Sequence, residues 1–317
     1  MKNLRKSFAI VISAVLCFGM SSCAPSEPKE GQAPLEVSEV SITESLNTPF
    51  YILIVGNDSR TGTAEITVDG YRDGVGRSDT VMLVNIDPTT FNLDIVTVPR
   101  DTATTHNGKT VKLNQVYAES GIDALEKEVE KLTGSAILHC FDMGFVQFEK
   151  FVNEISGLDA NVPVEMKLKD IVSGNDITLA PGDQHLMGAE ALVLARTRKV
   201  FETDQDARRQ ISDRALVESG VISVASNKIT SNVATQALLA NCKTTYPSAD
   251  LEKIINLFVE NHAKITINST TGPHVGSVDE ASGLYLIPRD EATWKAITDA
   301  INKGENPEGI VELPSLP

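Results

Sequence analysis

The spacing of apolar residues in the first half of the chain predicts several buried strands. Runs rich in Val, Ile and Leu occupy residues 51–55, 80–86 and 93–98, and short runs of this kind are typical of strands in a protein core. Residues 87–90 read Asp-Pro-Thr-Thr, which is the composition of a turn. The second and third runs are therefore expected to pair as an antiparallel hairpin around this turn.

The next segments have a helical periodicity. In residues 121–133 apolar side chains recur every three or four positions, and Gly134 is placed to end the helix. Further helices are expected over residues 145–155, from Gly188 onward, from Arg208 and Arg209 toward Val224, and over residues 234–243, 251–261 and 289–302, with extended segments at 160–166, 263–270 and 283–288. This order predicts one α/β/α sandwich domain with a central mixed β-sheet flanked by helices.

The helix predicted over residues 145–155 has an aromatic stripe. Phe145, Phe148 and Phe151 recur at helical spacing, together with Ile155. Such a stripe favours packing in the protein core, and the alternative is a wall of a lipid pocket. We expect the core packing.

The chain begins with a basic segment, an apolar stretch that is short for a membrane span, and small residues before Cys23. This pattern predicts a lipoprotein-type signal peptide over residues 1–22 and lipidation of Cys23; the alternative is a signal peptide cut near Ser22 beside an incidental cysteine. Residues 23–47 are rich in Pro, Glu and Ser and are expected to form a flexible tether. The globular domain is expected over residues 48–317.

The composition narrows the range of partners. The formal net charge is −15, so neither a nucleic acid nor a bare anionic lipid surface is expected to bind the molecule as a whole. Cys140 and Cys242 are the cysteines that would remain as thiols after the signal is removed and Cys23 is acylated. We expect both to be buried thiols, with a disulfide as the alternative.

Charged residues stand at the outer ends of the predicted strands. Arg77 and Asp79 precede one strand of the hairpin, and Arg100 and Asp101 follow the other. Antiparallel pairing would bring Asp79 and Arg100 together to within a residue or two of register. Asp58 follows a third apolar run. Surface ion pairs are the simpler interpretation, but ligands commonly bind just beyond strand ends in α/β proteins.

A second group of arginines lies farther along the chain, at Arg196, Arg198, Arg208 and Arg209. Guanidinium groups match phosphate oxygens and keep their charge at any working pH; a solvated helix face is the alternative. The chain has no P-loop, dinucleotide-binding, zinc-protease or serine-hydrolase motif. Carboxylates with arginines, and histidines without ligand spacing, favour an oxygen-ligand cation such as Mg²⁺ beside a phosphate, and hence phosphoryl transfer.

Over roughly residues 50–225 the chain resembles the LytR-CpsA-Psr proteins. The resemblance rests on the stretches ILIVGNDSR, RSDTVMLVNID, VTVPRDT, KLNQVY, GFVQFEKFVNEISGL and LAPGDQHLMGAEALVLARTR, which occur in the family's order. It implies an extracytoplasmic α/β/α domain that binds a polyprenyl pyrophosphate. Such enzymes transfer a glycopolymer from this carrier to peptidoglycan, form a phosphodiester and release polyprenyl phosphate. After removal of the predicted signal, the lipid on Cys23 would anchor this chain to the outer side of the membrane.

The resemblance also implies roles for single residues. Asp58 and Asp79 are implied as ligands of Mg²⁺, with Mn²⁺ as the alternative, and Asp101 as the residue that orients the arginines or supports the metal. The implied catalytic and substrate-binding residues are Arg77, Arg100, Lys112, Arg196, Arg198, Arg208 and Gln210. The sequence DARRQISDR departs from the family's spacing, so either Arg208 or Arg209 faces the phosphate. A pyrophosphatase and a lipoprotein that binds the lipid carrier without turnover are the rival functions.

Overall fold

The computed structural model describes residues 46–64, 76–226 and 229–317. The predicted signal peptide, Cys23 and almost all of the predicted tether lie outside the described residues. No helix in the described part of the chain is long and apolar enough to cross a membrane.

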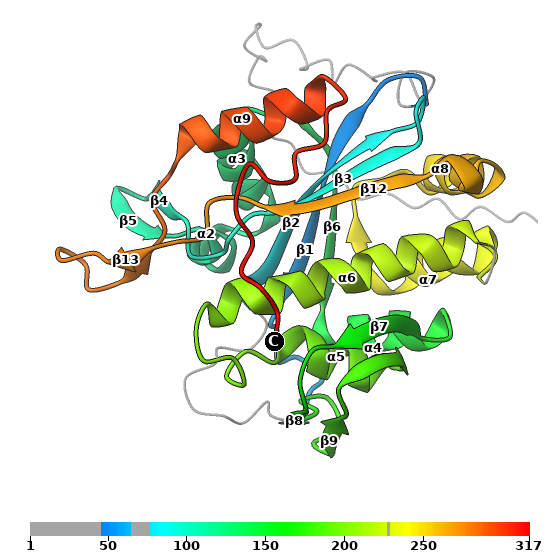
Figure 1. Ribbon diagram of the computed structural model, residues 1–317, viewed down its shortest axis with the longest axis horizontal. Helices are drawn as coiled ribbons and strands as arrows, with labels where there is room; N and C mark the ends of the chain where they lie inside the picture. Colours follow the sequence, from blue (N-terminus) through cyan, green and yellow to red (C-terminus); the bar gives the residue numbers. More distant parts are fainter. Residues whose placement is uncertain (1–45, 65–75, 227–228) are drawn as a thin grey trace, which may run out of the picture. The chain divides into compact units, whose positions relative to one another are not determined.

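A six-stranded mixed sheet forms the centre of the domain (Figure 1). Its strands, in spatial order, are β11 (Lys243–Thr244), β6 (Ile137–Gly144), β1 (Phe50–Asn57), β2 (Ser78–Asp87), β3 (Asn92–Thr97) and β12 (Thr266–Thr271). Strand β1 pairs antiparallel with β2 and parallel with β6, and β12 pairs parallel with β3. The predicted fold class is therefore confirmed.

The predicted hairpin is also confirmed. Strands β2 and β3 pair antiparallel, with Met82 opposite Thr97 and Asp87 opposite Asn92. The Asp87 carboxylate closes the turn by accepting a hydrogen bond from the Thr89 N–H at 2.8 Å. Because the strands run back along one another, the residues before β2 and after β3 meet at the open end of the hairpin.

One face of the sheet is covered by α3 (Ile122–Thr133) and α9 (Glu291–Asn302). Leu53 packs there in a buried cluster with Val129 and Trp294. Helix α3 ends at Gly134, whose φ of 72° is the left-handed conformation that glycine adopts without strain. Helix α2 (Leu113–Ser120) precedes α3.

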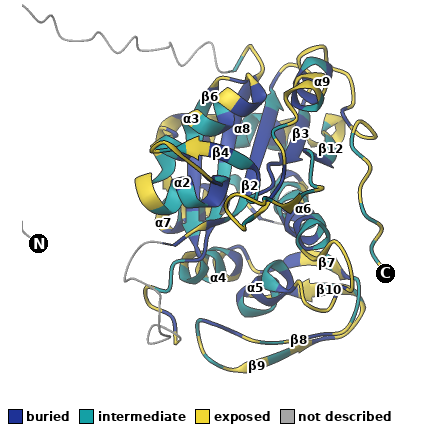
Figure 2. Cartoon of the chain, turned by 90° about the vertical axis from the view of Figure 1, so that its left-hand side faces the viewer, coloured by how far each residue is buried: buried dark blue, intermediate teal, exposed yellow. Residues whose placement is uncertain are grey.

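The opposite face is covered by a second set of helices (Figures 1 and 2). These are α4 (Phe145–Glu154), α6 (Gln205–Ala225), α7 (Ser231–Asn241) and α8 (Ser248–Glu260). Helix α5 (Gly188–Arg196) packs against α4 and α6. Below α6 lie the small hairpins β7 (Leu158–Val162) with β10 (Gly182–Leu186), and β8 (Met166–Lys169) with β9 (Asp176–Leu179). The predicted extended segment at 160–166 is thus divided between two strands.

The remaining short elements lie at the edge of the domain. They are the hairpins β4 (Ala103–His106) with β5 (Lys109–Lys112) and β13 (Ser277–Val278) with β14 (Tyr285–Leu286), and the 3-10 helix η1 (His262–Lys264). Cys140 and Cys242 are both free thiols. Cys140 is buried as expected, whereas Cys242 is only half-buried, which corrects that expectation.

Candidate active site

The charged residues at the strand ends line one cavity of about 810 Å³. We call its charged end the mouth. The mouth carries seven cationic side chains and four carboxylates, namely Arg60, Arg77, Arg100, Lys112, Arg196, Arg198 and Arg209 with Asp58, Asp79, Asp101 and Asp213. This excess of positive charge lies in a molecule whose net charge is −15. The mouth therefore suits an anion that the rest of the surface would repel.

Backbone and side-chain bonds fix Asp58 at the end of β1. Its Oδ1 accepts a hydrogen bond from the Arg77 N–H at 2.6 Å, and its own N–H donates to the Arg77 carbonyl at 3.0 Å. The neighbouring Asn57 donates from Nδ2 to Asp142 Oδ1 at 2.7 Å, and Tyr117 donates its hydroxyl to Asp142 Oδ2 at 2.8 Å. The loops that carry Asp58 and Arg77 are thus held together.

Arg100 joins the two strand ends at the open end of the β2–β3 hairpin to α6. Its Nη1 lies 2.6 Å from Asp79 Oδ1, and its Nη2 lies 3.0 Å from Asp206 Oδ1. Burial alone would lower the pKa of Arg100, but the carboxylates of Asp79 and Asp206 outweigh it and raise the pKa. Arg100 Nε is buried without a hydrogen-bond partner. The predicted proximity of Asp79 and Arg100 is confirmed as a direct ion pair.

Arg209 holds α6 against the mouth. Its guanidinium contacts Asp206 at 3.2 Å and Asp213 at 2.5 Å, and Nη2 donates to the Asp79 carbonyl at 2.8 Å. Burial opposes its charge, but Asp213 and Asp206 outweigh this and raise the Arg209 pKa. Because each of its nitrogens already has a protein partner, Arg209 serves here mainly to position the carboxylates around Arg100.

The structure places Arg209, and not Arg208, at the cavity. Arg208 lies over the Phe201 ring, with 5.9 Å between Cζ and the ring centroid, and it is not among the lining residues. Successive residues of a helix point about 100° apart, so neighbours on α6 face different surroundings. Gln210 is buried and donates to Asp206 Oδ2 at 2.7 Å, away from the lining. The structure thus places Arg208 and Gln210 outside the cavity lining, and their predicted substrate contacts stay predictions.

Three other predicted site residues do line the cavity. Lys112 lies 2.9 Å from Asp101 Oδ1, so this pair closes one side of the mouth. Arg198 lines the cavity from a loop that is anchored by Phe201, whose ring is buried and whose N–H donates to the Arg198 carbonyl at 3.1 Å. Arg196 lies over the Phe145 ring at 5.1 Å.

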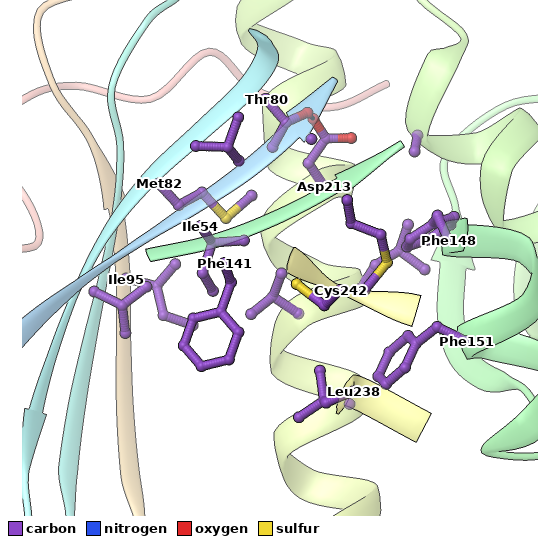
Figure 3. A pocket seen from close by; sticks show the side chains of 18 of the residues that line it. Ile54, Thr80, Met82, Ile95, Phe141, Phe148, Phe151, Asp213, Leu238 and Cys242 are labelled. Atoms are coloured by element: carbon purple, nitrogen blue, oxygen red, sulfur yellow. Dashed lines mark hydrogen bonds between the residues drawn. The ribbon is translucent and has the colours of Figure 1, made fainter. Parts of the chain in front are cut away.

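Beyond the mouth, the cavity is lined almost wholly by apolar side chains, a part that we call the apolar interior. Figure 3 shows Thr80 and Asp213 at one end, and below them Ile54, Met82, Phe141 and Ile95 from the sheet and Phe148, Phe151 and Leu238 from helices. Cys242 also lines it, and burial raises the pKa of this thiol to about 12, so the sulfur is neutral. The expected core packing of the stripe is confirmed for Phe148, Phe151 and Ile155, which belong to or pack against a buried cluster. The same side chains, with Phe145, also line this cavity, as the alternative interpretation had it.

The donor atoms at the mouth match an oxygen-ligand cation. Asp58 and Asp79 line the same cavity; Asp58 accepts a hydrogen bond from the Arg77 N–H, and Asp79 accepts one from Arg100 Nη1. Magnesium is commonly held by one or two carboxylates while phosphate and water oxygens complete its shell. No three His, Cys, Asp or Glu side chains gather as a full protein cage in residues 46–64, 76–226 and 229–317. The two carboxylates therefore fit a metal that a phosphate ligand completes.

Sequence reasoning did not identify the acidic residues of α6 or Thr80. Asp213 Oδ2 accepts from Thr80 Oγ1 at 2.7 Å, which ties α6 to β2. A signal was present, because Asp206, Arg209 and Asp213 stand three and four residues apart and so share one helix face. For the apolar interior the aromatic stripe over residues 145–155 was a signal for one wall. The other walls come from segments far apart in the sequence.

Comparison with known proteins finds related bacterial transferases. The chain is 28% identical over 272 residues to the polyisoprenyl-teichoic acid–peptidoglycan teichoic acid transferase TagV of Bacillus subtilis (strain 168), covering 82% of this chain and 63% of TagV. It is 29% identical over 187 residues to the TagU transferase of Bacillus mycoides (strain KBAB4), covering 58% of this chain and 54% of TagU. The chain thus spans less than two thirds of the length of these relatives.

The fold also has solved counterparts. The crystal structure of B. subtilis TagV superimposes with a TM-score of 0.64 at 21% identity, covering 85% of this chain and 99% of that one. The model of the LytR_cpsA_psr family matches residues 17–302, which include every residue of the mouth. This chain is therefore a member of the LytR-CpsA-Psr family.

Proposed function

We propose that this protein is a Mg²⁺-dependent phosphotransferase that moves a glycopolymer from a polyprenyl pyrophosphate carrier to peptidoglycan, on the extracytoplasmic side of the membrane. The observation that carries the proposal is the continuity of one cavity from a cation-rich mouth into an apolar interior. A lipid-linked diphosphate has the same division into a charged group and an apolar chain.

The dimensions of the apolar interior support a lipid tail. Lining residues follow β2 from Thr80 to Ile86, a distance of roughly 20 Å at the rise of a strand. Helices α6, α7 and α8 supply the opposite wall with residues such as Val221, Leu238 and Ile254. A surface of this kind excludes water and gains stability from burying hydrocarbon.

The mouth supplies the charge compensation that phosphoryl transfer needs. In the proposed reaction an acceptor hydroxyl attacks the sugar-proximal phosphorus, the bond to the bridging oxygen breaks, and the released polyprenyl phosphate carries the hydroxyl proton in the overall balance. Arg77, Arg196 and Arg198 would bind the diphosphate oxygens, and Arg100 would stabilise the departing phosphate. Asp58 and Asp79 would hold Mg²⁺, which when bound neutralises further phosphate charge.

The relatives support the same class of reaction. TagV and TagU bear the name of transferases that act on polyisoprenyl-linked teichoic acid and peptidoglycan. The wall polymer that this chain transfers is left open in the proposal. Lipidation at Cys23 would hold the mouth near the membrane that contains the carrier.

Turnover of a defined lipid substrate tests the function. The protein in detergent would be mixed with a polyprenyl pyrophosphate-linked sugar, Mg²⁺ and a peptidoglycan acceptor, and the products separated by mass spectrometry. We expect polyprenyl phosphate together with a phosphodiester-linked glycan, and loss of both with a chelator. Release of sugar phosphate to water without an acceptor would instead identify a pyrophosphatase, and binding without products would identify a carrier-binding protein.

Replacing Arg100 by Met should remove most of the activity. Loss of one hydrogen-bond donor that stabilises transition-state charge, as in a protease oxyanion hole, lowers kcat by about 10²- to 10³-fold. Arg208→Met is the matched control, because Arg208 lies away from the cavity, and it should retain near-normal turnover. Thermal unfolding of both variants would show that each is folded, and full activity of a folded Arg100→Met protein would reject the assigned role.

A further inference from the structure

Arg60 is a cation of the mouth for which the sequence suggested no role. It follows β1 by a short turn, in which its carbonyl accepts hydrogen bonds from the Thr63 N–H at 3.1 Å and the Thr63 hydroxyl at 2.9 Å. Its side chain lines the same cavity as Asp58 and Arg196. The turn thus presents Arg60 to the mouth from a fixed backbone.

Phe145 is brought beside this turn by the parallel pairing of β1 and β6. Gly144, the last residue of β6, pairs with Asn57, the last residue of β1, and Phe145 then begins α4. The approach is close, because a Cβ on Gly144 would lie 2.9 Å from Gln147 Oε1 and 3.2 Å from Asn57 Oδ1. The first ring of the phenylalanine stripe is therefore held at the end of the sheet where the mouth lies.

The Phe145 ring contacts two guanidinium groups from distant parts of the chain. Arg60 Cζ lies 5.7 Å and Arg196 Cζ lies 5.1 Å from the ring centroid, both within the range of cation–π attraction. Two like charges would otherwise repel one another. The ring attracts both guanidiniums through its quadrupole and so favours their positions beside it. Arg196 Nη1 also donates a hydrogen bond to the Lys169 carbonyl at 3.4 Å.

The position of this trio along the cavity indicates what it binds. Phe145 lies beside Arg60 and Arg196 of the mouth, while Phe148 and Phe151 of the same helix face the apolar interior. The two guanidiniums therefore stand near the boundary between the charged and the apolar parts of the cavity. A phosphate attached directly to a lipid tail would occupy this boundary.

We propose that Arg60 is a ligand of the lipid-proximal phosphate and that Phe145 is the positioning residue that holds Arg60 and Arg196 for it. This rests on the proposed function, because it assumes a lipid-linked phosphate in the cavity. Arg60 and Arg196 would then bind the lipid-proximal phosphate both before and after transfer, because the released polyprenyl phosphate retains that phosphate.

Binding of short probes separates the phosphate contact from the lipid contact. Affinities of the full chain for farnesyl diphosphate with Mg²⁺, farnesyl monophosphate and farnesol would be measured by titration calorimetry in detergent. We expect Phe145→Leu and Arg60→Met each to lower the affinity for both phosphorylated probes about tenfold and to leave the affinity for farnesol unchanged. Phe145→Tyr, which keeps the ring face, should bind all three like the unchanged protein.

Phe148→Leu is the matched control, because Phe148 lies on the same helix but faces the apolar interior. Phe148→Leu should lower the affinity for all three probes by the same factor. Melting temperatures of the variants would show that binding losses do not come from unfolding.

Two results would overturn the inference and leave the proposed function standing. One is a Phe145→Leu protein whose affinity for farnesol falls as much as its affinity for the phosphorylated probes. That result would mean that the Phe145 ring contacts the lipid and does not position the arginines. The other is unchanged phosphate binding by Arg60→Met. Failure of the unchanged protein to bind any of the three probes would instead reject the proposed function together with the inference.

Discussion

The two faces of the six-stranded sheet carry the same kinds of residue but have different surroundings. Along β1, Leu53 belongs to a cluster with helices α3 and α9, whereas Ile52 and Ile54 face the other way and line the cavity. Strand residues alternate between the two faces, so both sets follow from one apolar run. Both faces carry buried apolar clusters, but residues of the second face also line the cavity.

Close approach of a helix explains the packing of the face that carries Leu53. Trp294 of α9 is buried against the end of β12, where a Cβ on Gly272 would lie 2.1 Å from the ring. The small residue lets the largest side chain of the cluster fill the layer. On the opposite face α6, α7 and α8 leave about 810 Å³ between themselves, α4 and the sheet. The spacing of the covering helices therefore decides which face has room for a ligand.

The charged residues of the mouth lie next to the apolar interior. Residues after β1 and before β2 lie at the end of the same space that Ile54 and Met82 line. An anion at the mouth and a hydrocarbon chain in the apolar interior would thus be adjacent.

The largest expected effect is a difference in stability between truncations on the two faces. Leu53→Ala should lower the free energy of unfolding by about 2–5 kcal/mol, because it removes buried atoms and leaves a cavity. Ile54→Ala removes as many carbon atoms beside existing space, so we expect a loss below about 2 kcal/mol. Urea unfolding followed by circular dichroism measures both values. Equal losses would mean that the two faces are equally packed.

A smaller effect is expected when the apolar interior is partly filled. Val221→Phe should lower the affinity for farnesyl diphosphate about tenfold while changing the unfolding free energy by less than about 1 kcal/mol, because the added ring enters open space. The neighbouring Ile222 is 53% exposed and does not line the cavity. Ile222→Phe is therefore the control and should bind the probe normally. Unaltered binding by Val221→Phe would argue against lipid in this space.

The smallest expected effect is on the pH dependence of stability, through a glutamate of α4. Burial, together with the neighbouring Asp170 carboxyl, raises the pKa of Glu149 on α4 from its ordinary 4.5 to about 8. The folded protein therefore retains a proton that the unfolded chain releases, so this contribution to stability is lost as pH rises from about 4.5 to 8.

Glu149→Gln should remove that part of the pH dependence. The difference in melting temperature between pH 5 and pH 9 should be smaller in this variant than in the unchanged protein. Glu252→Gln, at an exposed position of α8, is the control and should keep the full difference. A Glu149→Gln protein with the original pH dependence would place the titrating group elsewhere.

Much of the local structure was predictable because its causes are local. The Asp-Pro turn and the flanking apolar runs predict β2 and β3, and antiparallel geometry then brings Asp79 to Arg100. Gly134 predicts the end of α3 for an equally local reason. The candidate site was therefore readable at the hairpin, where a short stretch of chain places its own charges together.

The sequence by itself determined the strands, the amphipathic helices and the charges at the strand ends. Tertiary structure decided which apolar side chains only pack in the core, such as Leu53, and which also line the cavity, such as Phe148. It also decided that Arg209, and not Arg208, points to the mouth. Apolar periodicity specifies that a face avoids water, but the distance to the element opposite depends on the packing of many remote side chains at once.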